Sequence, residues 1–130
     1  MEFSIMNNAD FLREIMDIKF TVTSGYRCPI HNLKVGGAKN SFHLQGKALD
    51  FTVARKELLP LIYRVAIASG RFNGIGINTT KNYIHIDNGD RKTPFYYVYP
   101  PQGGRKQLCP EVLAKIQAET VEEHLLEYKV

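Results

Sequence analysis

Residues 42–53 read FHLQGKALDFTV, and this stretch sets the arrangement from which the rest of the chain can be interpreted. Gly46-Lys47 has the form of a two-residue turn with glycine first, so the stretch predicts a β-hairpin. In its register His43 pairs with Asp50. Directly opposed residues place their Cβ atoms about 4.5–5.5 Å apart on one face, close enough to share a metal ion. The residues that then point into the core are Leu49, Phe51 and Val53.

A second short stretch, YIHID at residues 83–87, has the strict alternation of a β-strand. Its isoleucines are expected in the core, and Tyr83, His85 and Asp87 share the opposite face. Together with His43 and Asp50, His85 supplies two imidazoles and a carboxylate. That is a ligand set of catalytic zinc sites, which keep one coordination position open for water.

Hydrophobic spacing predicts the other elements. A helix begins at Asn8 or Asp10 and ends near Asp17, and a longer helix at 56–69 is stopped by Gly70. A final helix begins at Pro110 and extends to about residue 127. Its apolar stripe comprises Val112, Leu113, Ile116, Val121, Leu125 and Leu126. Strands are expected at 19–23 and 73–77, and a turn of helix at 30–33.

Composition indicates one domain over residues 1–130, with the motifs in a core of about 10–92. The chain is 44% hydrophobic and 23% charged, with a net charge of +4. Its basic residues are scattered, which favours a solvated surface over a nucleic-acid partner. Two cysteines, Cys28 and Cys109, are too few for a disulfide framework and are either two thiols or one bridge. No membrane span and no secretion signal are visible, so we expect synthesis in the cytoplasm and another route of export.

Three ordered motifs resemble those of the zinc D-alanyl-D-alanine carboxypeptidase family. They are Ser-Gly-Tyr-Arg at residues 24–27, Ser-x-His-x-x-Gly-x-Ala-x-Asp at 41–50, and His-x-Asp at 85–87. Gly36-Gly37-Ala38 fills the element between the first two. The likeness is to the compact members of the family, which include peptidoglycan endopeptidases of phage lysins.

The resemblance implies an α+β fold of the hedgehog or DD-peptidase kind. Such a fold has a small antiparallel sheet, with helices on one side and a zinc cleft on the other. His43, Asp50 and His85 match the ligands of one zinc ion. Arg27 matches an arginine that grips substrate oxygens, which its planar fork can do bidentately, or it pairs with a nearby acid to hold its loop. Ser41 either hydrogen-bonds substrate or a zinc ligand, or caps a turn.

Proton transfer is the part of the pattern in which this sequence departs from the family. Several branches place a glutamate or histidine a few residues before the third ligand, but residues 79–83 read TTKNY. Asp87 is therefore the candidate catalytic carboxylate. It is expected either to accept the proton of water or to orient His85. Tyr83, on the same face, is a candidate for substrate contact or for wall packing.

The two remaining histidines are expected at the surface, His31 on a loop and His124 on the polar side of the last helix. The aromatic run at residues 95–99 either lines a substrate groove or forms an edge strand or flap that covers the core. Neither histidine is therefore a predicted zinc ligand, and the predicted chemistry rests on His43, Asp50, His85 and their neighbours.

By resemblance, the expected function is zinc-dependent hydrolysis of a stem peptide in bacterial peptidoglycan. The reaction is that of a D-Ala-D-Ala carboxypeptidase or an L-Ala-D-Glu endopeptidase, and the protein is of bacterial or phage origin. The alternative is a zinc-containing module that binds peptidoglycan, or serves as a structural part, without catalysis. We assume a monomer that acts on the cell wall.

Overall fold

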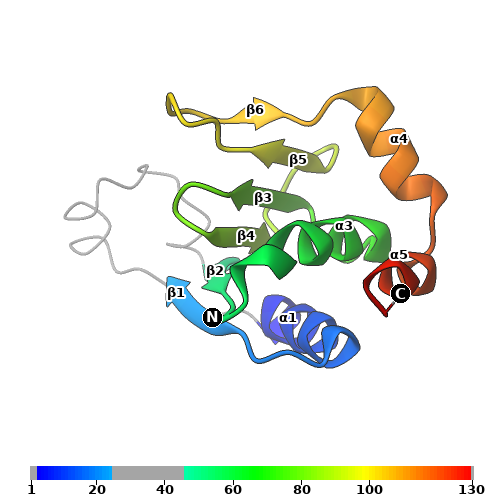
Figure 1. Cartoon of the computed structure of the whole chain (residues 1–130). Helices are drawn as coiled ribbons and strands as arrows, with labels where there is room; N and C mark the ends of the chain where they lie inside the picture. The colour runs from blue at the N-terminus through cyan, green and yellow to red at the C-terminus, as the bar shows by residue number, and fades with distance from the viewer. Residues whose placement is uncertain (1–2, 25–45, 130) are drawn as a thin grey trace.

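The computed structural model describes residues 3–24 and 46–129, and places six strands in one sheet (Figure 1). The strand order is β1-β2-β4-β3-β5-β6. The strands are β1 (Thr21–Ser24), β2 (Ala48–Thr52), β3 (Gly74–Asn78), β4 (Tyr83–Asp87), β5 (Phe95–Val98) and β6 (Lys106–Gln107). Together with the helices, this sheet confirms the α+β class.

One pair of strands departs from the expected antiparallel arrangement, because β3 and β5 are parallel. Strand β4 returns antiparallel along one edge of β3, so only the other edge of β3 is available to the next strand. The chain then stays at the end where β3 begins, and β5 starts beside it, with Phe95 opposite Gly74. The aromatic run is therefore an inner strand, covered at its outer edge by β6.

The structure gives Asp50 other cross-strand partners than the predicted His43, which itself lies outside the described residues. Asp50 has Ser24 of β1 on one side and His85 of β4 on the other. A strand has only two hydrogen-bonding edges, and at Asp50 both are occupied. The sequence placed Asp50 on the correct face, but the tertiary fold chose a different neighbour.

Helix α1 (Phe3–Met16) begins earlier than expected and ends at the expected place. Asp17 adopts a left-handed conformation with φ of 52°. Its N–H donates to the Glu14 carbonyl, and the Ile18 N–H donates to the Arg13 carbonyl. This is the Schellman pattern that satisfies the last carbonyls of a helix.

The predicted helix at 56–69 is confirmed, with a first turn that is a 3-10 helix. That turn is η1 (Lys56–Leu58), and α3 (Leu59–Ser69) continues it to the left-handed Gly70. The five predicted apolar residues are all buried: Leu58, Leu59, Ile62, Val65 and Ala66. Proline is tolerated in the first turn because its missing N–H has no partner there.

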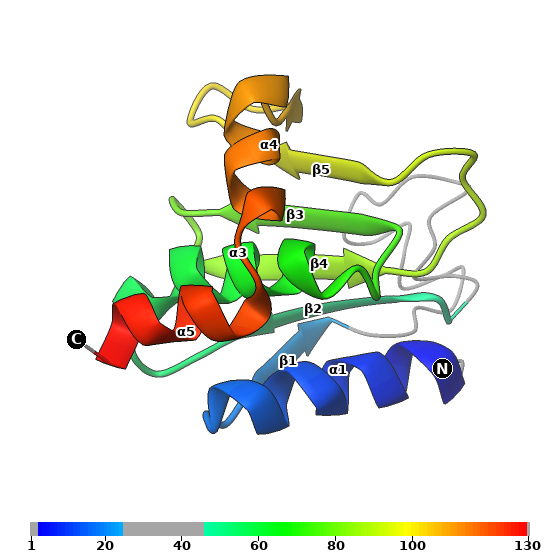
Figure 2. The ribbon, with the colours of Figure 1, turned by 90° about the vertical axis from the view of Figure 1, so that its right-hand side faces the viewer.

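The core lies between the helices and one face of the sheet (Figure 2). It includes Leu12 of α1, Ile62 of α3 and the sheet residues Phe51, Ile84 and Ile86, all with 0% exposure. Alternation along β2 and β4 then turns Asp50 and His85 toward the opposite face. The core therefore determines which face carries the polar residues.

The single C-terminal helix that the sequence predicted is two helices, α4 (Pro110–Ala118) and α5 (Val121–Lys129). Glu119 is extended, with φ of −99° and ψ of 143°, and breaks the helix. Because of this break the apolar residues do not form one stripe. Ile116 is buried, whereas Val112 and Leu126 are exposed.

None of the helices in the described part of the chain is long and apolar enough to cross a membrane.

Candidate metal centre

Asp50 and His85 are direct cross-strand partners on β2 and β4. Their side chains meet on the face opposite the core, with His85 Nδ1 donating to Asp50 Oδ1 at 2.8 Å. Both are largely shielded from solvent, with side-chain exposures of 16% for Asp50 and 12% for His85. Two of the three predicted ligands are therefore adjacent.

Asp87 lies on the other side of the His85 ring. His85 Nε2 donates to Asp87 Oδ2 at 2.7 Å. The carboxylate is fully buried, and it also accepts hydrogen bonds from the Gly89 backbone N–H and from Arg91. Asp87 is thus held by three donors, and the imidazole separates it from Asp50.

The two carboxylates shift the titration of the ring between them. Burial by itself would lower the pKa of His85, but the hydrogen bonds to Asp50 and Asp87 outweigh it and raise that pKa. Burial would likewise raise the pKa of Asp87, but hydrogen bonds from His85 and Arg91 outweigh it and lower that pKa. Asp87 is therefore a carboxylate at neutral pH.

This geometry fits a metal ligand. Once His85 has lost one proton, the tautomer with the remaining N–H on Nε2, toward Asp87, would turn the Nδ1 lone pair toward Asp50. Metal-binding histidines commonly donate their other N–H to a carboxylate in this way, which fixes the tautomer and the ring orientation. One imidazole nitrogen and one carboxylate oxygen are donors that zinc accepts.

Two glycines in β3 make room for the site. Gly74 and Gly76 are the neighbours of Asp87 and His85 across the β3–β4 pair. A Cβ atom at Gly74 would collide with the Asp87 carboxylate, and one at Gly76 would collide with the Tyr97 ring. Any other residue at either position would displace a side chain of the site.

Three tyrosines, Tyr83, Tyr97 and Tyr99, form a wall beside His85, here called the tyrosine wall. The His85 and Tyr97 rings are 6.2 Å apart, the Tyr97 and Tyr99 rings 5.3 Å, and the Tyr83 and Tyr99 rings 5.8 Å. Burial raises the pKa of Tyr83 to about 12, so its hydroxyl is a hydrogen-bond donor at neutral pH. A pocket of about 300 Å³ adjoins the wall at Tyr83, Tyr99 and Lys81.

Three predicted site residues, Arg27, Ser41 and His43, lie outside the described residues, as do Cys28 and His31. One contributor was missed from the sequence, Arg91, and Tyr97 was expected only as part of the aromatic run at residues 95–99. For Arg91, its spacing of four from Asp87 was a usable signal. The place of Tyr97 beside His85 had no local signal, because it depends on the parallel pairing of β5 with β3.

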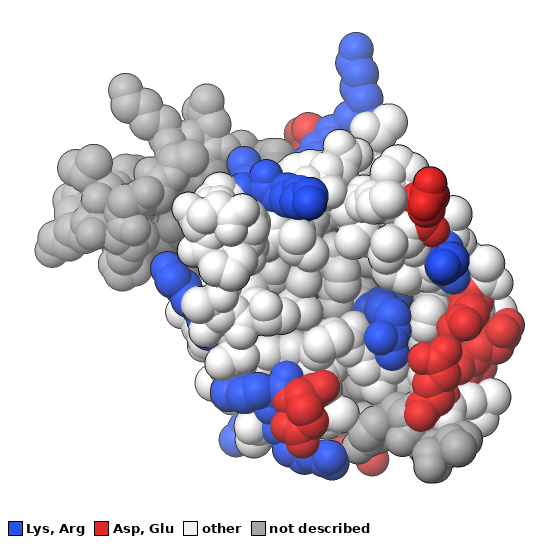
Figure 3. Space-filling view, turned by 45° about the horizontal axis from the view of Figure 1, so that its top comes forward, with Lys and Arg blue, Asp and Glu red and all other residues white. Residues whose placement is uncertain are grey.

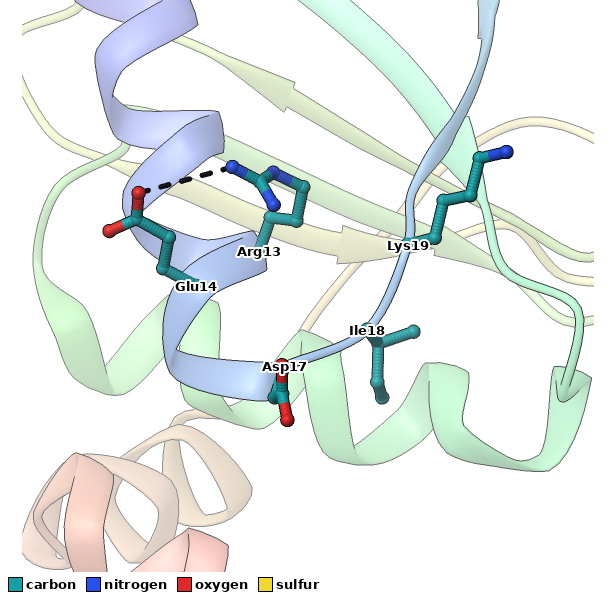
Figure 4. Close-up of a pocket in the computed structure, with 5 residues that line it drawn as sticks. All are labelled: Arg13, Glu14, Asp17, Ile18 and Lys19. Atoms are coloured by element: carbon teal, nitrogen blue, oxygen red, sulfur yellow. Dashed lines mark ion pairs between the residues drawn. The ribbon is translucent and has the colours of Figure 1, made fainter.

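A separate pocket at the end of α1 is lined mainly by charged residues and includes none of the described site residues (Figure 4). Its lining includes Arg13, which pairs with Glu14 at 3.9 Å and with Asp10, outside the pocket, at 3.6 Å. These pairs are local and exposed, as in an ordinary solvated surface. The pocket therefore offers no chemistry to compare with that around His85.

Comparison with known proteins adds a family and two named relatives. The sequence model of a family described as Peptidase M15 matches residues 2–87, a range that includes Asp50, His85 and Asp87. The chain is 34% identical over 84 residues to the probable peptidoglycan L,D-endopeptidase MepK of Haemophilus influenzae, covering 61% of this chain and 44% of that protein. It is 37% identical over 71 residues to the peptidoglycan L,D-endopeptidase MepK of Escherichia coli, covering 51% and 38%. The matched part of the chain spans less than half the length of either relative.

Proposed function

Because this chain belongs to the Peptidase M15 family, we propose that it is a zinc-dependent L,D-endopeptidase that hydrolyses a peptide bond in bacterial peptidoglycan. The observation that carries the proposal is the hydrogen-bonded series Asp50, His85 and Asp87, in which one imidazole nitrogen faces a candidate ligand and the other faces a buried carboxylate. The L,D specificity is taken from the names of the two relatives.

In this proposal one zinc ion is held by Asp50, His85 and His43. When bound, zinc lowers the pKa of water toward roughly 7 and polarises a carbonyl group. A hydrogen bond joins Asp50 and His85 across β2 and β4, so the two strands hold both candidate ligands side by side. The alignment reduces the reorganisation that binding requires.

Asp87 acts as a positioning residue. Its carboxylate is fully buried and bonded to His85, Gly89 and Arg91, so a water molecule on the Asp50 side of the ring is out of its reach. Of the two roles expected for Asp87, orientation of His85 is the one that this geometry favours. Its negative charge also raises the basicity of the imidazole.

The tyrosine wall provides the substrate-binding side of the proposed site. The protonated hydroxyl of Tyr83 can donate to a peptide carbonyl, and the pocket beside it offers the cation of Lys81 to a substrate carboxylate. Arg27 is proposed to grip a second carboxylate and Ser41 to hydrogen-bond the peptide. Stem peptides carry free carboxylates, which suits such a set of donors.

The test is digestion of purified peptidoglycan by chelated protein and by the same protein with zinc restored. Mass analysis of the released muropeptides identifies the bond, since each cut adds one water and exposes a new amine and a new carboxyl group. We expect cleavage between an L and a D residue with zinc only, and none for Asp50→Ala or His85→Ala.

A matched control is Asp90→Ala, whose side chain is 93% exposed and which should leave cleavage unchanged. A folded, zinc-loaded protein that cuts no wall substrate would overturn the proposal and support the non-catalytic peptidoglycan-binding module. Removal of a terminal D-alanine alone would instead support the carboxypeptidase alternative.

A further inference from the structure

A second cluster of metal-ligand side chains lies where α4 meets α5, on elements beyond the part of the chain that the family matches. It consists of Glu119, His124 and Glu127, whose ligand atoms all lie within 4.8 Å of one another. In Figure 3 acidic side chains gather along the right-hand edge, where α4 and α5 lie in Figure 1, with basic side chains beside them. The cluster is therefore distant in sequence from Asp50 and His85.

The start of α5 fixes the cluster in place. The Glu123 N–H donates to the Thr120 hydroxyl at 3.1 Å, and the Thr120 N–H donates to the Glu123 carboxylate at 3.4 Å. This reciprocal pair is a capping box, which sets where the helix begins. From that start His124 and Glu127, three residues apart, share one face of α5.

His124 is buried, not on the surface as its sequence context predicted, and is only 2% exposed. Its Nε2–H donates to the Ile116 carbonyl at 2.9 Å, near the C-terminal end of α4. A carbonyl can only accept, so the proton of a neutral His124 sits on Nε2 and Nδ1 carries the lone pair. A backbone carbonyl commonly fixes the tautomer of metal-binding histidines in this way.

His124 Nδ1 faces a carboxylate oxygen. Glu119 Oε2 is 3.2 Å away, and both atoms are buried and lack a hydrogen-bond partner. Two buried acceptors that face each other are unfavourable unless a cation or a proton lies between them. Ligand atoms at about 2.0–2.1 Å from one tetrahedral zinc ion are roughly 3.3–3.4 Å apart, which matches this separation.

We propose that Glu119, His124 and Glu127 form a binding site for a zinc-class divalent cation that joins α4 to α5. Glu127 is half-exposed and keeps one oxygen paired with Arg64 at 3.4 Å, leaving its other oxygen for the ion. Ligating carboxylates usually have such a second partner. A pocket of about 160 Å³, lined by these residues with Lys115 and Ile116, gives the ion access from solvent.

The competing arrangement is a proton in place of the ion, with a charged His124 bonded to Glu119. Arg64 and Lys115 line the same pocket and disfavour a further cation. Against them stand two carboxylates and a neutral imidazole, a donor set of two oxygens and one nitrogen that zinc accepts. The two arrangements differ in one measurable quantity, the number of ions bound.

The experiment measures zinc bound per chain after chelation and equilibrium dialysis against zinc ions, with detection by mass spectrometry of the metal. The wild type should bind two equivalents and His124→Gln one. His85→Ala should bind one equivalent of zinc, and the double variant His85→Ala/His124→Gln should bind none. The result at His124 is thus independent of whether the proposed peptidase site binds zinc.

Glu119→Gln is the second variant, because the Glu119 side chain as a whole is 38% exposed and the change spares the buried histidine. It should weaken zinc binding at this site, and Glu122→Gln, in the first turn of α5 and outside the cluster, should not. Zinc should also raise the Tm of His85→Ala but not of His85→Ala/His124→Gln. Equal zinc content of His85→Ala and His85→Ala/Glu119→Gln would overturn the proposal and leave the protonated ion pair.

Discussion

Asp50 and His85 occupy the same position on neighbouring strands, and their side chains are 2.8 Å apart because β2 and β4 pair in that register. Backbone hydrogen bonds of two inner strands therefore set the distance between two candidate ligands. Such strands are more rigid than loops, and a site built on them is held more accurately. The same register places Ala48 opposite Asp87, which leaves room for the buried carboxylate.

Replacing Asp87 with asparagine should lower zinc affinity about 10–100-fold, as loss of a ligand's hydrogen-bonding carboxylate typically does. The amide can still accept the His85 N–H but lacks the charge. Competition with a zinc-binding dye measures the affinity, and circular dichroism confirms that the variant is folded. Asp90→Asn is the control, and an unchanged affinity in Asp87→Asn would contradict the positioning role.

Replacing Gly76 with alanine should destabilise the protein by about 1–3 kcal/mol, the usual cost of overpacking. The new methyl group would collide with the Tyr97 ring, which packs over β3. Urea unfolding measures the loss. If the collision is the cause, the same substitution in a Tyr97→Ala background should cost much less, and equal costs in both backgrounds would rule it out.

Replacing Tyr63 with phenylalanine should cost about 1–3 kcal/mol, because the Tyr63 hydroxyl donates to the Tyr97 carbonyl at 2.9 Å in the core and its loss leaves that carbonyl unpaired. Burial raises the pKa of Tyr63 above its usual value of 10. The folded protein therefore holds the Tyr63 proton more tightly than the unfolded chain does. The stability that this difference contributes is fully present below pH 10 and is lost as the pH rises above 10. Unfolding from pH 8 to 11 should therefore show a shallower decline in the variant than in the wild type, and parallel curves would contradict this account.

Replacing Thr120 with alanine should lower the free energy of unfolding by about 1 kcal/mol, the typical value of a helix N-cap. The lost contacts are the reciprocal hydrogen bonds with Glu123. Thermal unfolding measures the change, and Thr79→Ala, in the exposed β3–β4 turn, is the comparison. A loss no larger than that of Thr79→Ala would mean that tertiary packing alone holds the start of α5.

The sequence determined which residues share a face. Alternation in YIHID placed Tyr83, His85 and Asp87 together and buried the two isoleucines, and helical spacing located residues 56–69. These features depend on the chain's local geometry, with a repeat of 2 for strands and 3.6 for helices. Local geometry was also sufficient to predict the strands that became β3 and β4, which a short turn joins.

Only the tertiary structure decided which strands and helices became neighbours. It gave Asp50 the partners Ser24 and His85, brought Tyr97 beside His85, and buried His124 against the end of α4. Each of these contacts joins segments whose pairing depends on which sheet edges and helix ends remain available after the rest of the chain has packed. The repeat of a strand or helix determines which face a side chain occupies. Which other side chain lies beside it on that face depends on how all the strands and helices pack together.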